Sequence, residues 1–397
     1  VSRTGVADPN ITHRKRSNFY VIDEGDSVVY RMWASVRATQ LCSWQESWAH
    51  PTQFGYRRGK RSVDPAWCSA AAAEHAWLSQ AHRVGFSLDL AKAYDRIPHE
   101  ILYKCLIASG LPVNFCNTWL SAIRGARKYL KSAYGLGRSF HVTRGLPQGD
   151  ALACFGMNLI MSIWSRAVES ESDVFVRSFA DDATVEVERP DPSIAAAQLQ
   201  KAISVTEEFT TLSGQKPNVG KCHVWSTSRK GRKALRGLKM LGKPLVQKWH
   251  AKDLGCQTLF CGPARSTFLQ ARFAKARKTA KRVQCAPLRL EDKVQLVTGA
   301  ASSLANYGLE TCFIGESALA RVRSAVVMAI WNHRRRFRSS HAVLLLFTQS
   351  HLTDPFHAQV YQCLTTLKRC LSQNPPVRDR KSTRLNSSHV KRSRMPS

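Results

Sequence analysis

Residues 174–187 read VFVRSFADDATVEV, and two adjacent aspartates, Asp181 and Asp182, interrupt what otherwise looks like a pair of short strands. Like charges at contact distance repel, so a structural role for the pair requires hydrogen bonds or a cation that offsets the repulsion. A β-turn favoured by aspartate is the structural alternative. Other motifs in the sequence are needed to distinguish a structural turn from a cation-binding site.

The chain as a whole is strongly basic. Its 397 residues include 59 Lys and Arg against 28 Asp and Glu, and the net charge of +31 is spread along the sequence. Such a field favours a polyanion, with nucleic acid as the first partner and an anionic membrane surface as the second. Apolar runs such as residues 342–347 are far too short to span a membrane, so we expect no membrane insertion.

The termini and the cysteines bear on the compartment. No signal peptide is visible, although the chain starts with Val1 and its true beginning can be missing. The twelve cysteines contain no C-x-x-C pair and no Cys/His cluster at zinc spacing. We interpret them as reduced, mostly buried thiols, which predicts an intracellular protein.

The order of patterns predicts an α+β fold. Helical spacing of apolar residues predicts helices over residues 28–41, 69–82, 98–109, 114–124, 154–169 and 195–212. Strands are expected over residues 84–90 and 222–226, with hairpins over residues 128–143 and 174–187. Because these elements alternate without a regular βαβ repeat, an α+β class is favoured. Three basic helices over residues 265–283, 290–307 and 317–337 predict a separate helical part.

A third carboxylate belongs with the aspartate pair. The stretch FSLDLAKAYDRIPHEIL, residues 86–102, sets Asp89 in a short apolar strand just before a turn into a helix. Its structural alternative is a helix N-terminal charge. Three carboxylates from two strands can instead bind two Mg²⁺ ions for an in-line phosphoryl displacement. Divalent cations would then neutralise the repulsion between the carboxylates.

Two glycine-bearing loops accompany the carboxylates. In TRGLPQGDALACFGMNLIM, residues 143–161, a tight loop presents backbone N–H groups and Gln148 to a cleft, with a plain turn capped by Asp150 as the alternative. In SGQKPNVGKCHVWS, residues 213–226, Lys221 stands between such a loop and a strand. Most lone lysines are simply solvated.

The motifs together resemble a known family. FSLDLAKAYD, RGLPQGD, FADD, SGQKPNVGK and DLGCQTLF occur in this order and look like the palm motifs of reverse transcriptases of the non-LTR retrotransposon (LINE-like) type. PTQFGYRRGKRSVDPAW, residues 51–67, resembles the fingers motif of the same family. The resemblance covers residues 28–262 and implies a right-hand polymerase fold and RNA-templated DNA synthesis by two-metal-ion nucleotidyl transfer.

The resemblance implies a catalytic set. Asp89, Asp181 and Asp182 match the carboxylates that hold two Mg²⁺ ions, with Mn²⁺ as a possible substitute. Lys221 matches the lysine that protonates departing pyrophosphate as a general acid. The implied partners are an RNA template, a DNA primer and dNTPs, while protein partners stay open.

The resemblance also implies a set of substrate contacts. Tyr94 matches the aromatic residue beneath the nucleotide sugar that disfavours a 2′-hydroxyl. Gln148 and Gly149 match residues that border the incoming nucleotide and the template. Arg57 matches the fingers arginine that clamps the triphosphate, because its planar fork suits phosphate oxygens.

The resemblance divides the chain into parts. Residues 28–84 correspond to fingers, 85–262 to palm with fingers elements at 96–143, and 263–340 to a helical thumb that would follow the template–primer backbone. HRRRFR at residues 333–338 is the densest basic cluster, and a solvated charge run is its alternative. Residues 341–378 are a C-terminal extension without a recognised motif.

Both ends depart from the family pattern. Residues 1–27 are polar and irregular where the family has an arginine-proline-isoleucine segment, which suggests a frameshift, a deletion or an unusual splice. Residues 379–397 resemble a translated sequencing-library adapter, and without their six basic and one acidic residues the charge is still about +26. No endonuclease, zinc knuckle or RNase H is recognised, so the chain looks like a polymerase core from a longer polyprotein.

Two alternatives to an active reverse transcriptase stay open at this point. A decayed copy would bind nucleic acid through its basic surface without chemistry, and a protein similar to group II intron maturases would share the same core. A nuclear location is expected by analogy with elements that are primed at chromosomal DNA.

Overall fold

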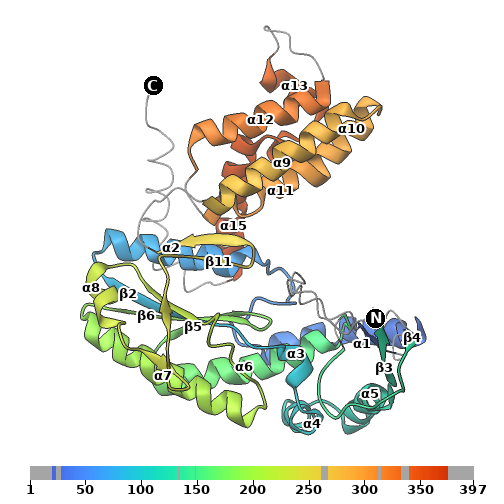
Figure 1. Ribbon diagram of the computed structural model, residues 1–397, viewed down its shortest axis with the longest axis vertical. Coiled ribbons are helices and arrows are strands. Elements are labelled where there is room, and N and C mark those ends of the chain that lie inside the picture. The colour runs from blue at the N-terminus through green and yellow to red at the C-terminus, as the bar shows by residue number, and fades with distance from the viewer. Residues whose placement is uncertain are drawn as a thin grey trace, which may run out of the picture. The chain divides into compact units, whose positions relative to one another are not determined.

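The computed structural model describes residues 20–23, 28–132, 135–147, 149–260, 267–311, 314–331 and 339–373 (Figure 1). The chain forms two compact units, Val1–Trp48 with Lys92–Ile160 and Ala49–Ala91 with Met161–Ser397. Three features predicted from the sequence fall in the gaps between the described ranges: the contact made by Gln148, the basic cluster at residues 333–338, and the tail at residues 379–397.

The first unit is mainly helical. Its helices are α1 (Val28–Trp48), α3 (Ala93–Arg96), α4 (His99–Ala108), α5 (Val113–Gly125) and the start of α6 (Ala153–Ser172). Leu102 and Leu106 lie one turn apart on α4 and are fully buried, as is Trp119 on the neighbouring α5. This spacing of apolar residues explains why the predicted helices form here.

A small antiparallel sheet completes the first unit. Its strand order is β1 (Tyr20–Asp23), β3 (Lys128–Ser132) and β4 (Gly135–Leu136). The hairpin expected over residues 128–143 is present in shortened form. The prediction that residues 1–27 are irregular is wrong for Tyr20–Asp23, because these residues pair with β3 over four positions. A four-residue strand between polar segments gives only a weak signal in the sequence.

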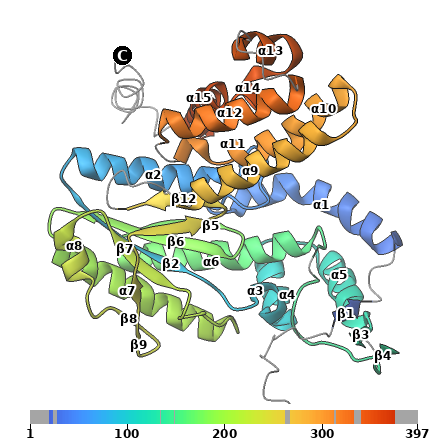
Figure 2. The same cartoon turned by 45° about the horizontal axis from the view of Figure 1, so that its top comes forward.

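The second unit is built on a five-stranded sheet. Its strand order is β10 (Val246–Gln247), β7 (His223–Ser226), β2 (His82–Leu88), β6 (Asp182–Arg189) and β5 (Phe175–Phe179), antiparallel except for the β10–β7 pair. Helix α2 (Val63–Leu78) covers one face and α7 (Pro192–Leu212) the other (Figure 2). Val84, Phe86 and Val185 are fully buried in the sheet.

Shorter elements follow the sheet along the chain. They are α8 (Arg229–Ala234), β8 (Lys239–Met240), β9 (Lys243–Pro244), and the hairpin of β11 (His250–Asp253) and β12 (Cys256–Leu259). At the tip of this hairpin Leu254 and Gly255 both have positive φ, 46° and 79°, as tight two-residue hairpin turns require.

The C-terminal part of the second unit is a helical bundle. It contains α9 (Thr267–Cys285), α10 (Leu290–Leu296), a π-helical turn (Val297–Ser302), α11 (Ser303–Asn306), a 3₁₀ turn (Leu309–Thr311), α12 (Glu316–Trp331), α13 (Ser340–Phe347), α14 (Ser350–Thr353) and α15 (Pro355–Gln373). Phe273 of α9 and Val327 of α12 share one core with Leu344 and Ala358. Residues beyond 340 therefore belong to the same core as the basic helices. None of the described helices is long and apolar enough to cross a membrane.

The fold class agrees with the sequence, and several boundaries differ. The α+β class is confirmed, with a mostly antiparallel sheet as its centre. Helix α2 begins at Val63, six residues before the predicted start at 69, because Asp64 and Pro65 suit a first helical turn. The helix expected over residues 290–307 is interrupted by the π-helical turn.

Candidate active site

The aspartate pair lies at the tip of the β5–β6 hairpin. The last strand pair is Phe179 with Asp182, which leaves Ala180 and Asp181 as a two-residue turn. Ala180 has φ 55°, in the left-handed region that residues with a Cβ rarely adopt. Gly55 packs against this turn, and a Cβ built at Gly55 would lie 2.4 Å from the backbone nitrogen of Ala180. The turn is thus held in a fixed and locally strained conformation.

The strand register brings Asp89 to this turn. Strands β2 and β6 are antiparallel, and their last pair at this end is Leu88 with Ala183. Asp89 follows Leu88 on β2, and Asp182 precedes Ala183 on β6. Because the strands are antiparallel, the two carboxylates lie at the same end of the strand pair. The carboxyl-terminal end of β2 and the tip of the hairpin therefore form one acidic edge, which brings together the carboxylates of two separate sequence motifs.

The carboxylates interact electrostatically. Burial raises the pKa of Asp181, and the negative charge of Asp89 raises it further. Asp89 is partly buried, with 32% of its side chain exposed, while Asp182 is exposed. Oxygen ligands from clustered carboxylates are what Mg²⁺ and Mn²⁺ prefer. The donor set therefore fits divalent cations, which would relieve the repulsion that acts on Asp181.

Lys221 joins the carboxylates through the loop that precedes β7. The backbone N–H of Asn218 donates to the Asp89 carbonyl at 2.8 Å, and the Lys221 N–H donates to the Asn218 carbonyl at 2.8 Å. These bonds hold the loop beside the end of β2. The Lys221 Nζ lies 3.7 Å from Asp89 Oδ2, and 69% of the Lys221 side chain is exposed. The ammonium group of Lys221 therefore lies beside the acidic edge and is open to solvent.

A cavity of about 300 Å³ opens at this edge. Asp89, Asp182 and Lys221 line it, together with residues from the same sheet face and from the β11–β12 hairpin. Residues two positions apart recur in the lining, because alternate side chains of a strand point to the same face. The lining residues that the sequence did not single out include Ser69, Ser87, Thr184, His223, Trp225, Lys248, Lys252, Thr258 and Phe260.

His223 is one of the lining residues that sequence reasoning missed. It is 8% exposed, and its Nδ1 lies 3.2 Å from the Lys221 carbonyl, so Nδ1 carries the proton and donates. Burial, reinforced by the charge of Lys248, lowers the pKa of His223 to about 4. The ring is therefore neutral at physiological pH. The period of two along Lys221, His223 and Trp225 was the signal that could have identified it.

An aromatic stack supports the wall of the cavity. The rings of Trp225 on β7 and Phe260 after β12 are stacked with centroids 4.2 Å apart and planes 7° apart. Trp225 lies over Gly85 of β2, and a Cβ at Gly85 would come within 2.3 Å of the indole ring. Only glycine at this position lets the ring lie flat on the sheet. The hairpin that carries Lys252 is thereby packed against β7.

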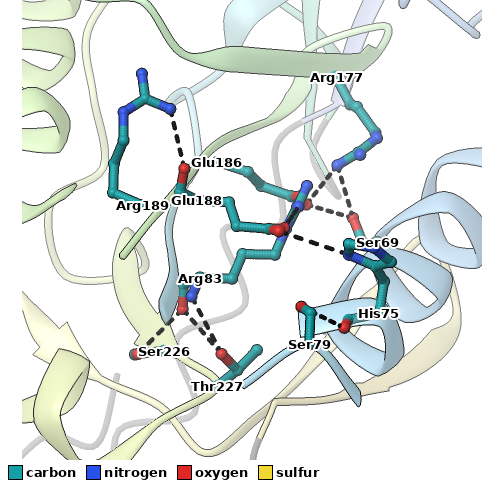
Figure 3. A network of polar contacts seen from close by, with 10 residues as sticks. All are labelled: Ser69, His75, Ser79, Arg83, Arg177, Glu186, Glu188, Arg189, Ser226 and Thr227. Carbon is teal, nitrogen blue, oxygen red and sulfur yellow. Dashed lines mark hydrogen bonds and ion pairs between the residues drawn. The ribbon is translucent and has the colours of Figure 1, made fainter. Parts of the chain in front are cut away.

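A buried ion network fixes α2 over the same sheet face. Glu186 of β6 is fully buried between Arg83 of β2 and Arg177 of β5 (Figure 3). Ser69 of α2 donates to Glu186 Oε1 at 2.7 Å, and Arg83 Nε donates to Glu186 Oε2 at 2.9 Å. Burial alone would raise the pKa of Glu186, but the charges of Arg177 and Arg83 lower it to about 2. Because Ser69 lines the cavity, this network holds one of its walls.

The remaining predicted residues lie elsewhere. Arg57 is half-buried, and its guanidinium donates to the carbonyls of His50 at 2.7 Å and Gln53 at 3.2 Å. It does not line the cavity among the residues described. Tyr94 on α3 and Gly149 belong to the first unit, where the Tyr94 carbonyl accepts from Leu146 N–H at 2.9 Å. The substrate roles of these residues stay predictions.

Asp150, the capping candidate of the structural alternative, accepts a backbone hydrogen bond in the turn before α6. Its Oδ1 accepts from the Leu152 N–H at 3.1 Å, just before α6, and Tyr30 donates to Oδ2 at 2.9 Å. The loop before it packs closely on α3, since a Cβ at Gly145 would lie 3.0 Å from the Asp95 carbonyl oxygen.

Comparison with known proteins identifies a protein family to which the chain is similar. A model of the family described as reverse transcriptase (RNA-dependent DNA polymerase) matches residues 27–257. The retrovirus-related Pol polyprotein from the type-2 retrotransposable element R2DM of Drosophila melanogaster is 27% identical over 229 residues. The match covers 56% of this chain and 21% of that polyprotein, so the chain spans about a fifth of the relative's length.

Solved structures give a more distant likeness. Telomerase from Candida albicans, solved with a fragment of telomeric RNA, is 12% identical with a TM-score of 0.40, over 84% of this chain and 56% of that one. The RNA-dependent RNA polymerase of a human picobirnavirus is 13% identical with a TM-score of 0.40, over 86% and 56%. The family assignment rests on the family model.

Proposed function

The chain belongs to the reverse transcriptase (RNA-dependent DNA polymerase) family, and from this premise we propose that it extends a primer 3′-OH with dNTPs copied from an RNA template. The observation that carries the proposal is the acidic edge, where Asp89 and Asp182 share a cavity with Lys221 and Asp181 forms the adjacent turn. Neither a binding-only copy nor a maturase-like protein gains support from the polyprotein relative.

Membership of this family implies dependence on a divalent metal ion. We propose two Mg²⁺ ions, with Mn²⁺ as a substitute, held by Asp89, Asp181 and Asp182. When bound, such ions supply charge neutralisation at the attacking and leaving oxygens of an in-line displacement. The protein contributes a fixed edge of carboxylates, because the strand register and the packing of Gly55 on the turn limit how far these residues can move.

The cations of the cavity have a separate role in the proposal. Lys221 approaches from the side of Asp89, and its exposed ammonium group can give a proton to pyrophosphate as it leaves. Lys248 and Lys252 line the cavity and would attract the phosphates of the substrates. His223 stays neutral there, so it adds no positive charge and presents an imidazole ring.

The proposal also assigns segments of the chain to the palm, fingers and thumb of a right-hand polymerase fold. We assign the five-stranded sheet to the palm, residues 28–84 and 96–143 to fingers elements, and the helices after residue 263 to the thumb. Tyr94 would exclude ribonucleotides, Gln148 and Gly149 would border the nucleotide and template, and Arg57 would clamp the triphosphate. Arg57 would first have to leave its backbone carbonyl partners.

The basic face of α9 suits the backbone of a template–primer duplex. Its exposed residues include Lys275, Lys278 and Lys281, which follow one another at helical spacing. Replacing all three with Ala should weaken binding of a primed RNA template, and the slope of log Kd against log salt should fall by about 2–3. Fluorescence anisotropy at several salt concentrations measures this. Lys201→Ala on α7 is the control, and an equal effect there would contradict the assignment.

Primer extension tests the proposed function. The purified protein is incubated with Mg²⁺, dNTPs and a DNA primer annealed to RNA templates of different length. The proposal predicts products that end at the template's 5′ end and disappear when EDTA is added. Tight binding of the primed template without any extension, with either Mg²⁺ or Mn²⁺, would overturn it in favour of a binding-only protein.

A further inference from the structure

The tip of the β11–β12 hairpin is clamped by side chains from the helical bundle. The two turn residues, Leu254 and Gly255, each present a backbone carbonyl. The Tyr307 hydroxyl donates to the Leu254 carbonyl at 2.7 Å, and the Arg272 guanidinium donates to the Gly255 carbonyl. The donors follow their acceptors by 53 and 17 positions in the sequence. Both carbonyls of the turn are therefore bound from the bundle.

Arg272 and Tyr307 hold each other in place. The Arg272 guanidinium also donates to the Tyr307 carbonyl, and its Cζ lies 5.3 Å from the centre of the Tyr307 ring. Burial raises the pKa of Tyr307, so its hydroxyl keeps its proton at physiological pH and donates it to the hairpin. Ser62, directly before α2, must then donate to the Tyr307 hydroxyl oxygen, 2.9 Å away. The clamp thus joins the hairpin tip, α9 and the start of α2.

The same guanidinium is connected to the cavity through an aromatic ring. Phe268 lies one turn before Arg272 on α9, and the Arg272 Cζ is 4.9 Å from the centre of the Phe268 ring. The Nζ of Lys252 on β11 lies 4.8 Å from the same centre. Cations are attracted to an aromatic face at such distances. Because Lys252 also lines the cavity, its place there is tied to Arg272 through the ring and through the hairpin backbone.

The other end of the hairpin is held by a different set of contacts. Phe260, which follows β12, stacks on Trp225 of the five-stranded sheet, and Ala251 of β11 shares this small core. The two four-residue strands pair with each other as a two-stranded sheet, and isolated hairpins of this kind are only marginally stable. Lys252 lies between the stacked base and the clamped tip, so its position depends on both.

We propose that Arg272 is a positioning residue for nucleotide addition, which holds the ammonium group of Lys252 at the cavity. This role rests on the proposed function, in which Lys252 attracts substrate phosphates. Arg272 itself is not among the residues that line the cavity. With a loose tip, a smaller fraction of molecules would present Lys252 to the triphosphate, and apparent affinity falls with that fraction. Arginine suits the clamp, because its planar fork donates to two carbonyls and stacks on rings as lysine does not.

Arg272→Lys tests this role, because it keeps the positive charge and removes the fork. We expect the KM for dNTPs in primer extension to rise roughly fivefold to tenfold, with kcat changed less than about twofold. The Kd of the primed template should stay unchanged. Arg289→Lys, with a side chain that is 84% exposed, is the matched control. An unchanged KM in Arg272→Lys would overturn the role and leave the proposed function standing, whereas no extension by the unaltered protein would overturn both.

A double variant separates positioning from a general loss of structure. Lys252→Met alone should raise the KM for dNTPs, and Arg272→Lys added to it should raise the KM little further, because residues that act through one another are not additive. Effects that multiply in the double variant would show that Arg272 does not act through Lys252.

Hydrogen exchange of the protein without substrates reports on the clamp independently of catalysis. Peptides that cover residues 250–259 should exchange faster in Arg272→Lys than in the unaltered protein or in Arg289→Lys. Tyr307→Phe, which removes only the hydroxyl bonds to Leu254 and Ser62, should shift both the exchange and the KM in the same direction and decides the case if Arg272→Lys does not fold. Unchanged exchange over this segment would contradict the clamp.

Discussion

Lys221 differs from the surface lysines in holding its Nζ 3.7 Å from a carboxylate of the acidic edge. Lys221→Ala should lower kcat for nucleotide addition by roughly 100-fold, the typical contribution of a general acid, and should leave KM nearly unchanged. Single-turnover extension measures both. Lys243→Ala, exposed on β9, is the control. A large rise in KM with an unchanged kcat would mean that Lys221 binds the nucleotide and does not protonate the leaving group.

Glu186 is the buried carboxylate on which three side chains of the second unit converge. Glu186→Gln leaves Arg83 and Arg177 without a buried negative partner, so it should reduce the free energy of unfolding by about 3 kcal/mol. Urea denaturation at pH 7 measures the loss. Glu171→Gln is the control, because its carboxylate is 62% exposed and its pair with Lys201 spans 3.8 Å. Similar losses in both variants would contradict the role of the network.

The same residue sets an expected pH dependence. The pKa of Glu186 is about 2 in the folded protein against an ordinary value of 4.5 for a glutamate side chain. The stabilisation is therefore fully present above about pH 4.5 and is lost as the pH falls toward 2. The unaltered protein should lose stability through this window, and Glu186→Gln should show a smaller decline. A parallel decline in both proteins would argue that other carboxylates control acid unfolding.

At the residue scale the sequence predicted the acidic groups better than their surroundings. Asp89, Asp182 and Lys221 were recognisable because each lies in a short motif beside a strand or a glycine-bearing loop. His223, Lys248 and Lys252 were not, since their place at the cavity depends on strand pairing between distant segments. Arg57 shows a different limit of the sequence. Its motif singles out the residue, but the motif does not predict the two backbone carbonyls that its guanidinium contacts.

At the scale of elements, Gly85 decides how the β11–β12 hairpin is supported. Gly85→Ala would push the Trp225 ring away from Phe260, and overpacking of this kind costs about 1–3 kcal/mol of stability. Thermal denaturation followed by circular dichroism measures the change. Gly125→Ala, at the end of α5 with no atom within 4 Å of the new Cβ, should be neutral or slightly stabilising. Equal stability of both variants would contradict the stacked arrangement.

Elements were predictable where their periodicity was long. The helices around residues 28–41, 98–109, 114–124, 154–169 and 195–212 all exist, with ends that differ from the predicted ones. The helices beyond residue 340 were missed, although Asp354 followed by Pro355 was a start signal for α15. Asp354 Oδ1 accepts the Phe356 N–H at 3.1 Å, as such a cap requires. The π-helical turn had no signal in the sequence.

At the scale of the whole molecule, the order of motifs was enough to predict the family, because each motif supplies part of one chemistry. The division into two compact units was not predictable, since each unit combines segments that are far apart in the chain. Such units are defined by contacts and not by changes of composition. The net charge of +31 was informative about the partner and silent about the fold.

In the proposed function the acidic edge performs the chemistry and does not merely shape a turn. Extension of a primed RNA template by Asp181→Asn, compared with Asp173→Asn at the other end of the same hairpin, tests it most directly. Both changes remove one negative charge, and the Asp173 side chain is 84% exposed. We predict at least about a 1000-fold loss of extension for Asp181→Asn with template binding retained, and no loss for Asp173→Asn. Unimpaired extension by Asp181→Asn would show that Asp181 takes no part in the chemistry.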